Sequence, residues 1–198
     1  QVITEIGEED MGSKVFQLFA SVAGEPVSYY LFFCLHSFLT NEYKVFWRAL
    51  PPMIAITFPD PDFKIVQDAG KDLIFDRFRK KYVVLTPEEW VRQNFMNYLV
   101  KNLDYPPSLI GIEKEIYLGE LKKRCDIVVY NRNTQPWMIV ECKEMGVPLT
   151  QSTLEQITRY HMVLPTDYLV ITNGLHTYCC VYRPEQQQWQ FLPALPAY

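Results

Sequence analysis

Three runs of apolar, largely β-branched residues lie close together in the middle of the chain. They span residues 110–118, 124–130 and 136–143, and the short polar stretches GELKK and NRNTQ lie between them. Apolar runs joined by short polar turns are typical of consecutive antiparallel strands. The pattern therefore predicts a three-stranded antiparallel meander.

Helical periodicity flanks this meander on both sides. Upstream, Thr86 has the character of an N-cap, Pro87 suits the first helical position, and Glu89 completes a capping box. We expect this helix to end at about residue 102. Downstream, residues 150–164 form the second predicted helix.

Strand patterns return after the second predicted helix. Residues 167–172 and 176–182 are rich in apolar residues, and residues 189–192 are a candidate edge strand. A helix between two strands of one sheet usually makes a right-handed parallel crossover, so the sheet should be mixed. The order of elements predicts an α/β (α+β) domain whose mixed central sheet is flanked by helices.

Shorter strand candidates precede the first helix. Residues 63–66 and 73–75 flank the glycine-containing turn QDAGKD and predict a hairpin. Residues 54–58 are apolar and form a further strand candidate.

The first fifty residues differ in composition from the remainder. They carry six acids and three bases, against 17 acids and 16 bases in the rest. Their apolar stretch, residues 27–39, is shorter than the roughly 20 residues of a membrane-spanning helix, and acidic residues precede it, unlike a signal peptide. We expect no membrane anchor.

The pair Pro51-Pro52 predicts a boundary between residues 1–52 and a domain at 53–198. Two interpretations of residues 1–52 stay open. One is a helical appendage packed on the domain, and the other is a non-native extension upstream of a natural start at Met53.

Composition restricts the class of protein. Apolar residues make up 48% and charged residues 21%, which favours a folded domain over a disordered chain. The net charge of −4 excludes a uniformly basic nucleic-acid binder, although it allows a local basic patch. The five cysteines lack CxxC spacing, which argues against a zinc site and favours a reduced, cytoplasmic setting.

The chemistry-bearing residues gather on two strands of the meander. Glu141 and Lys143 are two residues apart and face the same side, whereas Cys142 points away. Folding the hairpin back places Asp126 across from the region of Glu141. Two close carboxylates favour Mg²⁺ or Mn²⁺ over zinc, and an adjacent lysine can orient a water or stabilise developing charge.

Asp126 followed by Glu141-Cys142-Lys143 resembles the D…(D/E)xK signature of the PD-(D/E)XK nuclease superfamily. The segments TPEEWVRQ, KKRCDIVVY, IVECK, QITRY and VITNG resemble the N-terminal nuclease domain of type I restriction enzyme R subunits, including small stand-alone bacterial relatives. The resemblance covers about residues 75–198, or begins at Met53. It implies a restriction-endonuclease-like αβββαβ core.

The resemblance also implies residue roles. Asp126, Glu141 and the backbone carbonyl of Cys142 would bind the metal, and Lys143 would be catalytic. A glutamate on the first helix would complete the site, with Glu89 as our choice and Glu88 as the alternative.

Gln156 and Tyr160 are four residues apart on one helix face. The resemblance implies that they contact the metal site or the nucleic-acid backbone. The proline of the superfamily name is absent, because Arg124-Cys125 precedes Asp126.

Basic and polar residues near this constellation are candidate phosphate contacts, which position DNA without reading its sequence. They are Arg92, Gln93, Lys122, Lys123 and Arg124. Arg92 and Gln93 are equally compatible with an ordinary helix surface.

Simpler readings of the same residues exist. Asp126 could be a strand-edge acid paired with Arg124 or Lys122, and Glu141 with Lys143 could form a surface ion pair.

The expected function is that of a Mg²⁺- or Mn²⁺-dependent DNA endonuclease-type domain. The alternative is a catalytically silent module of the same fold that binds nucleic acid or protein. A third class is a structural or regulatory protein anchored by residues 15–39. The chain has no P-loop. We therefore expect any cleavage either to be independent of ATP or to use a restriction or repair partner that supplies the motor or the specificity.

Overall fold

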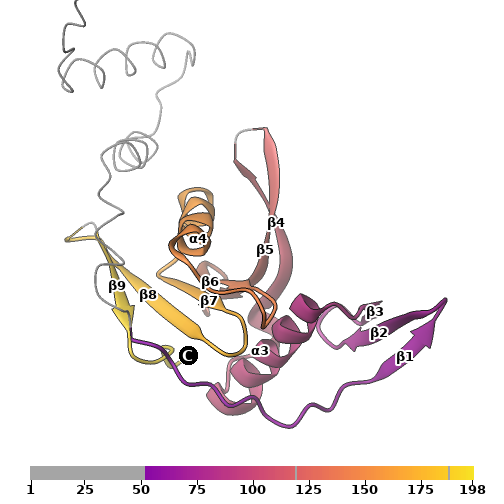
Figure 1. Ribbon diagram of the computed structural model, residues 1–198. Coiled ribbons are helices and arrows are strands. Elements are labelled where there is room, and N and C mark those ends of the chain that lie inside the picture. The colour runs from indigo at the N-terminus through magenta and orange to yellow at the C-terminus, as the bar shows by residue number, and fades with distance from the viewer. Residues whose placement is uncertain (1–51, 119, 187) are drawn as a thin grey trace, which may run out of the picture. The chain divides into compact units, whose positions relative to one another are not determined.

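Two separate β-sheets form in the part of the chain that the structure describes. The computed structural model describes residues 52–118, 120–186 and 188–198. The smaller sheet has three antiparallel strands, namely β1 (Ile65–Asp68), β2 (Lys71–Asp76) and β3 (Lys81–Val84). Figure 1 shows this sheet beside α3 (Pro87–Leu103), projecting away from the larger sheet.

The larger sheet has six strands in sequence order. They are β4 (Ile110–Leu118), β5 (Leu121–Tyr130), β6 (Pro136–Cys142), β7 (Tyr168–Thr172), β8 (Thr177–Arg183) and β9 (Gln188–Leu192). β6 and β7 pair in parallel, with α4 (Gln151–Val163) between them, and the other neighbouring pairs are antiparallel. The mixed sheet, the meander and the parallel β6–α4–β7 connection confirm the predicted fold class, which is consistent with a restriction-endonuclease-like fold.

The start and end of α3 follow from local sequence. Thr86 Oγ1 accepts a hydrogen bond from the Glu89 backbone N–H at 3.0 Å, and Pro87 occupies the first turn. Asp104 ends the helix in the left-handed region, at φ 56°, and the short 3₁₀ helix Pro107–Leu109 follows. The Thr86 cap is confirmed, but the Glu89 carboxylate binds other side chains instead of closing the capping box.

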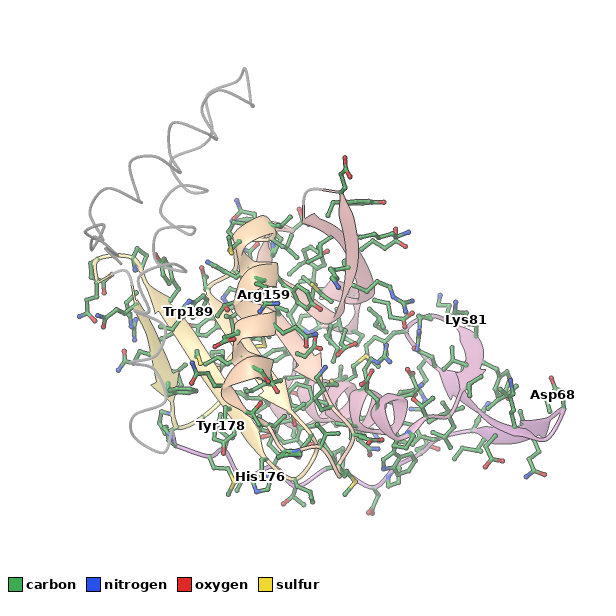
Figure 2. The ribbon with its side chains drawn as sticks, turned by 45° about the horizontal axis from the view of Figure 1, so that its top comes forward. Asp68, Lys81, Arg159, His176, Tyr178 and Trp189 are labelled. Atoms are coloured by element: carbon green, nitrogen blue, oxygen red, sulfur yellow. The ribbon has the colours of Figure 1, made fainter. Side chains whose placement is uncertain are left out.

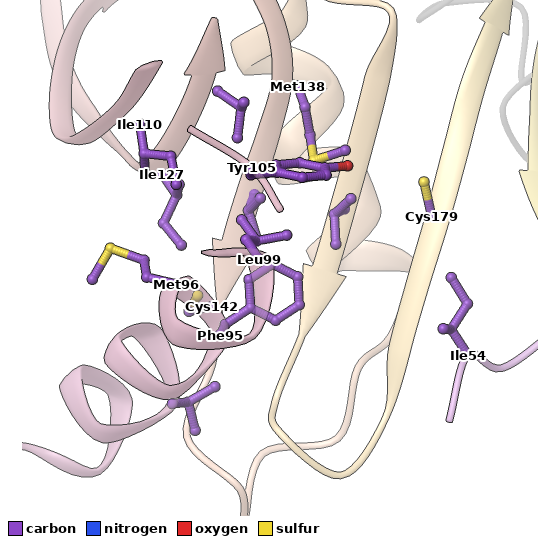
Figure 3. Packing of buried hydrophobic residues seen from close by; sticks show 14 residues of the cluster. Ile54, Phe95, Met96, Leu99, Tyr105, Ile110, Ile127, Met138, Cys142 and Cys179 are labelled. Atoms are coloured by element: carbon purple, nitrogen blue, oxygen red, sulfur yellow. The ribbon is translucent and has the colours of Figure 1, made fainter. Parts of the chain in front are cut away.

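The core lies between α3 and one face of the larger sheet. Phe95, Met96 and Leu99 of α3 pack with Ile127 of β5 and Met138 of β6, as Figure 3 shows. All five side chains are at most 1% exposed. Burial of these apolar side chains provides the main stabilisation of the domain.

Two features before α3 differ from the sequence-based expectation. The prediction of a strand at residues 54–58 is wrong, because only Ile54 makes a ladder-like bond, from its N–H to the Thr177 carbonyl at 2.9 Å. The predicted hairpin is confirmed as β1 and β2. The third strand, β3, was not predicted, because the basic run at residues 77–81 lies before and at its start and obscures its apolar pattern.

The smaller sheet has two unlike faces. Ile74 and Asp76 are fully buried, whereas Val66, Tyr82 and Val84 are 41–48% exposed. Figure 2 shows Asp68 and Lys81 on this sheet, apart from α4 with its Arg159.

The predicted appendage lies outside the described residues except for Pro52. The division into residues 1–52 and 53–198 therefore stays a prediction. Among the described helices, none combines the length and apolar character needed to cross a membrane.

Candidate active site

Asp126 and Glu141 lie where β5 and β6 separate. The ladder between these strands reaches the pair Ile127↔Val140, and one further step places Asp126 opposite Glu141. Asp126 Oδ2 accepts a hydrogen bond from the Cys142 N–H at 2.7 Å. The aspartate side chain thus takes the place of a backbone acceptor and is held beside the Cys142 peptide.

The two oxygens of the Glu141 carboxylate have different surroundings. Oε1 accepts hydrogen bonds from Lys143 Nζ at 2.7 Å and Gln156 Nε2 at 2.6 Å. Oε2 is buried and has no hydrogen-bond partner. Because an unpaired buried acceptor is costly, Oε2 is an oxygen ready to accept a further donor or a cation.

α4 supplies the polar side chains opposite Glu141. Gln156 Nε2 donates to Glu141 Oε1 and also to the Tyr160 hydroxyl, at 2.9 Å. Thr150 caps the start of this helix through a reciprocal box with Thr153. The predicted proximity of Gln156 and Tyr160 to the acidic pair is therefore what the structure shows.

Burial dominates the electrostatics of the acidic pair. Burial and, next in size, the negative charge of Asp126 raise the pKa of Glu141 to about 7, against the opposing hydrogen bond and charge of Lys143. Burial also raises the pKa of Asp126. Two carboxylates that are costly to ionise together would be stabilised as anions by a bound cation.

Lys143 stays protonated in this environment. Burial lowers its pKa, but the hydrogen bond and charge of Glu141 outweigh burial and leave the pKa above its ordinary value. The pair is not the surface ion pair of the simpler reading, because the Glu141 side chain is only 5% exposed and that of Lys143 23%.

A cleft of about 610 Å³ opens over the acidic pair. Its walls carry carboxylates and cations in similar numbers. The lining residues are Glu88, Arg92, Glu113, Glu115, Lys122, Lys123, Arg124, Asp126, Glu141, Gln156 and Tyr160.

Glu89 lies in an ion-pair cluster outside the set of lining residues. Its carboxylate binds Arg79 Nη2 at 2.6 Å, Arg92 Nη2 at 2.8 Å and Gln93 Nε2 at 2.9 Å. Glu88, the alternative glutamate on the same helix, lines the cleft. The structure thus brings Glu88 to the site and gives Glu89 a different set of partners.

The predicted phosphate contacts fall into two groups. Lys122, Lys123 and Arg124 line the cleft from β5, and Lys122 and Arg124 pair with Glu115 and Glu113 rather than with Asp126. Arg92 lines the cleft but is nearly buried, at 5% exposure.

Gln93 is 3% exposed and is hydrogen-bonded to Glu89, outside the lining set. Its amide is therefore not placed to meet a nucleic acid in the cleft.

Glu113 and Arg79 were not predicted as site residues. Glu113 belongs to the polar positions of an alternating strand, and Arg79 to a basic run, so neither pattern distinguishes them from solvated residues. The contacts of Glu113 with Arg79 and Arg92 exist only in the folded chain.

The donor set fits a hard cation, although the described residues contain no group of three or more His, Cys, Asp or Glu side chains in metal-binding proximity. Asp126 and Glu141 supply carboxylate oxygens, and Oε2 of Glu141 lacks a partner. Oxygen ligands of this kind suit Mg²⁺ or Mn²⁺, which usually retain several waters and need few protein ligands.

A family model described as type I restriction enzyme R protein N terminus matches residues 87–196. The chain belongs to this family. The match begins with α3 and includes every residue of the candidate site, while the three-stranded sheet precedes it. No curated protein matches the chain. Membership supports a nuclease-like domain related to the R protein N terminus and is consistent with the PD-(D/E)XK superfamily.

Proposed function

We propose that the domain hydrolyses phosphodiester bonds of DNA in a reaction that depends on Mg²⁺ or Mn²⁺. The observation that carries the proposal is the Glu141 carboxylate. It is buried beside Asp126, receives Lys143 and Gln156 on one oxygen, and keeps the other oxygen without a partner. Membership in the R protein N-terminal family supports a nuclease over other uses of such a site.

Asp126 and Glu141 would hold the metal, with the Cys142 carbonyl as a third oxygen. Glu88 is better placed than Glu89 to complete the site, because it lines the cleft. A divalent cation bound there would polarise a phosphodiester oxygen and make a bound water more acidic.

Lys143 would act on the reacting atoms themselves. Its protonated amine donates to Glu141 Oε1 and retains further N–H groups. One of these would donate to the attacking water or to the phosphate oxygen that gains negative charge, as preorganised donors do in other hydrolases.

Gln156 would orient Glu141. Its two amide hydrogens go to Glu141 Oε1 and the Tyr160 hydroxyl, which fixes the amide and leaves Oε2 of the glutamate free. We assign Gln156 and Tyr160 this positioning role.

Lys122, Lys123 and Arg124 would bind the DNA backbone at the cleft wall. Lys122 and Arg124 have side chains 54% and 61% exposed, so both can reach a phosphate without rearrangement of the core. Such contacts would position DNA without sequence readout. A partner in a restriction complex would then supply sequence preference or DNA movement.

The test is a cleavage assay with linear and supercoiled DNA in Mg²⁺, Mn²⁺ or EDTA. We expect metal-dependent cleavage by the wild type and its loss in Lys143→Ala. Lys101→Ala, which changes an exposed lysine of α3, is the matched control and should cleave normally.

Equal cleavage by wild type and Lys143→Ala would indicate a contaminant and contradict the proposal. No cleavage under any condition, with DNA binding retained, would favour the silent binding module.

A further inference from the structure

Glu113 lies on β4 directly opposite Asp126 on β5. The register runs from Ile112↔Ile127 to Lys114↔Cys125, so Glu113 and Asp126 occupy the position between these pairs. Glu113 has a φ of 48°, in the left-handed region that few non-glycine residues adopt. The strand thus departs from regular geometry at the residue that faces the candidate metal ligand.

Three guanidinium groups converge on the Glu113 carboxylate. Oε2 accepts from Arg79 Nη1 at 2.7 Å, while Oε1 lies 3.2 Å from Arg92 Nη1 and 3.6 Å from Arg124 Nη1. Arg92 and Arg124 line the cleft, but their side chains are 7% and 61% exposed. A single carboxylate oxygen therefore links a cation in the cleft wall to a cation at the solvent-exposed edge.

Arg79 holds Glu113 from outside the cleft. It lies in the turn between β2 and β3 and also binds the fully buried Asp76 and, at 2.6 Å, Glu89. With three carboxylate partners, the Arg79 side chain is fixed in one orientation. Glu113 is consequently held by a residue that does not line the cleft.

Arg92 depends on this arrangement. Its Nη2 pairs with Glu89 at 2.8 Å, whereas Nε has no hydrogen-bond partner and Nη1 meets Glu113 at 3.2 Å without hydrogen-bond geometry. The guanidinium therefore has unsatisfied donors in the wall beside Asp126. Its direction is set by the two carboxylates that flank it.

We propose that Glu113 is a positioning residue for DNA binding, which holds Arg92 and Arg124 at the spacing where both face one phosphodiester backbone. This inference rests on the proposed function, because it takes DNA as the ligand of the cleft. Glu113 would thus favour DNA binding even though its own negative charge repels the phosphates.

A positioning role and simple charge repulsion predict opposite changes in DNA affinity when Glu113 loses its negative charge. Removing a negative charge from a DNA-binding cleft should tighten binding if charge alone matters. Removing a positioning carboxylate should weaken binding, because two arginines lose their alignment. Glu113→Gln separates the two cases with almost no change in side-chain shape.

The experiment measures the affinity for a fluorescent DNA duplex by anisotropy, with Ca²⁺ in the buffer and at two salt concentrations. We expect Glu113→Gln to bind roughly tenfold more weakly than wild type, the size of one lost arginine contact. The matched control is Glu185→Gln, which removes the same charge at an exposed position outside the residues that line the cleft. It should bind as tightly as wild type or more tightly.

Variants of Arg124 test whether Glu113 affects DNA binding through this arginine. Arg124→Gln should weaken binding and reduce the salt slope by about one counterion. The double variant with Glu113→Gln should lose much less than the product of the two single losses. A fully multiplicative loss would contradict the coupling.

Glu113→Asp retains the charge but shortens the side chain, so positioning predicts weaker binding for this variant also. If circular dichroism shows that Glu113→Gln does not fold, the affinity of Glu113→Asp is compared with that of the wild type instead. Wild-type affinity in Glu113→Asp, or equal or tighter binding by folded Glu113→Gln, would overturn the proposal.

Failure of the proposed function is recognised separately. Wild-type protein that binds DNA without cleaving it would remove the hydrolysis and leave the positioning role intact. Wild-type protein that does not bind DNA would overturn both.

Discussion

At the scale of single residues, the site combines acids that resist ionisation with cations that remain charged. Burial raises the pKa of both Asp126 and Glu141, whereas Lys143 and Arg92 have pKa values above their ordinary range. For Arg92, burial lowers the pKa, but the charges of Asp126 and Glu89 more than compensate. A cation bound between Asp126 and Glu141 would therefore favour the ionised form of both carboxylates.

Metal binding should stabilise the fold through Asp126. We expect Mg²⁺ or Mn²⁺ to raise the Tm of the wild type and to leave that of Asp126→Asn unchanged. A ligand at 100 times its Kd stabilises by about 2.7 kcal/mol, which is large enough to detect by differential scanning fluorimetry. Asp72→Asn, at an exposed position of β2, should retain the full shift. A metal shift that survives in Asp126→Asn would refute the assignment of this ligand.

The pH dependence of stability should carry the signature of Glu141. Its folded pKa is about 7 and its ordinary value 4.5. Between these values the folded state binds more protons than the unfolded state, so the free energy of unfolding falls as pH rises through this window. In EDTA, Glu141→Gln should lose stability less steeply than wild type from pH 5 to pH 8, as measured by urea denaturation.

Glu144→Gln is the matched control for this measurement, because Glu144 is exposed three residues further along. It should follow the wild-type profile. Identical slopes for Glu141→Gln and the wild type would show that Glu141 does not titrate in this range.

At the scale of elements, the local pattern of the sequence predicted most helices and strands because their signals are short-range. The β4–β5–β6 meander follows from alternation and polar turns, and α3 begins at its Thr86 cap. β3 was not predicted, because it is stabilised by pairing with β2 and its short sequence shows little alternation of apolar and polar residues. Residues 54–58 do not form a strand, because Ile54 is the one residue of this segment with a ladder-like backbone hydrogen bond.

The Thr86 cap gives a prediction at this scale. Thr86→Ala removes the acceptor of the Glu89 N–H bond and should lower the free energy of unfolding by about 1 kcal/mol. Chemical denaturation measures the change. Ser108→Ala, at an exposed position in the 3₁₀ helix, should have no comparable effect. An unchanged midpoint for Thr86→Ala would show that water replaces the cap without cost.

At the scale of the whole molecule, distant parts of the sequence complete one core. Tyr105 donates a hydrogen bond to the Pro196 carbonyl at 2.6 Å, and Tyr198 donates to the Tyr130 carbonyl at 2.9 Å. Ile54 and Cys179 belong to the same buried cluster. Residues from both ends of the described chain, from Ile54 to Tyr198, thus contribute to one buried cluster.

A fragment of residues 53–198 should therefore fold by itself. We expect a soluble product with cooperative thermal unfolding and the same metal-dependent Tm shift as the full chain. Circular dichroism and scanning calorimetry measure both properties. Aggregation of the fragment would show instead that residues 1–52 cover apolar surface, as the anchored structural protein would require.

The sequence by itself determined the order of elements and the pairing of Asp126 with the Glu141–Lys143 strand. These follow from alternation along a strand and the reversal of a hairpin, which operate over a few residues. The tertiary structure decided which glutamate of α3 enters the cleft, and it joined Glu113 to Arg79, Arg92 and Arg124. Those contacts join side chains from β2–β3, α3, β4 and β5, and local periodicity carries no information about such long-range charge pairing.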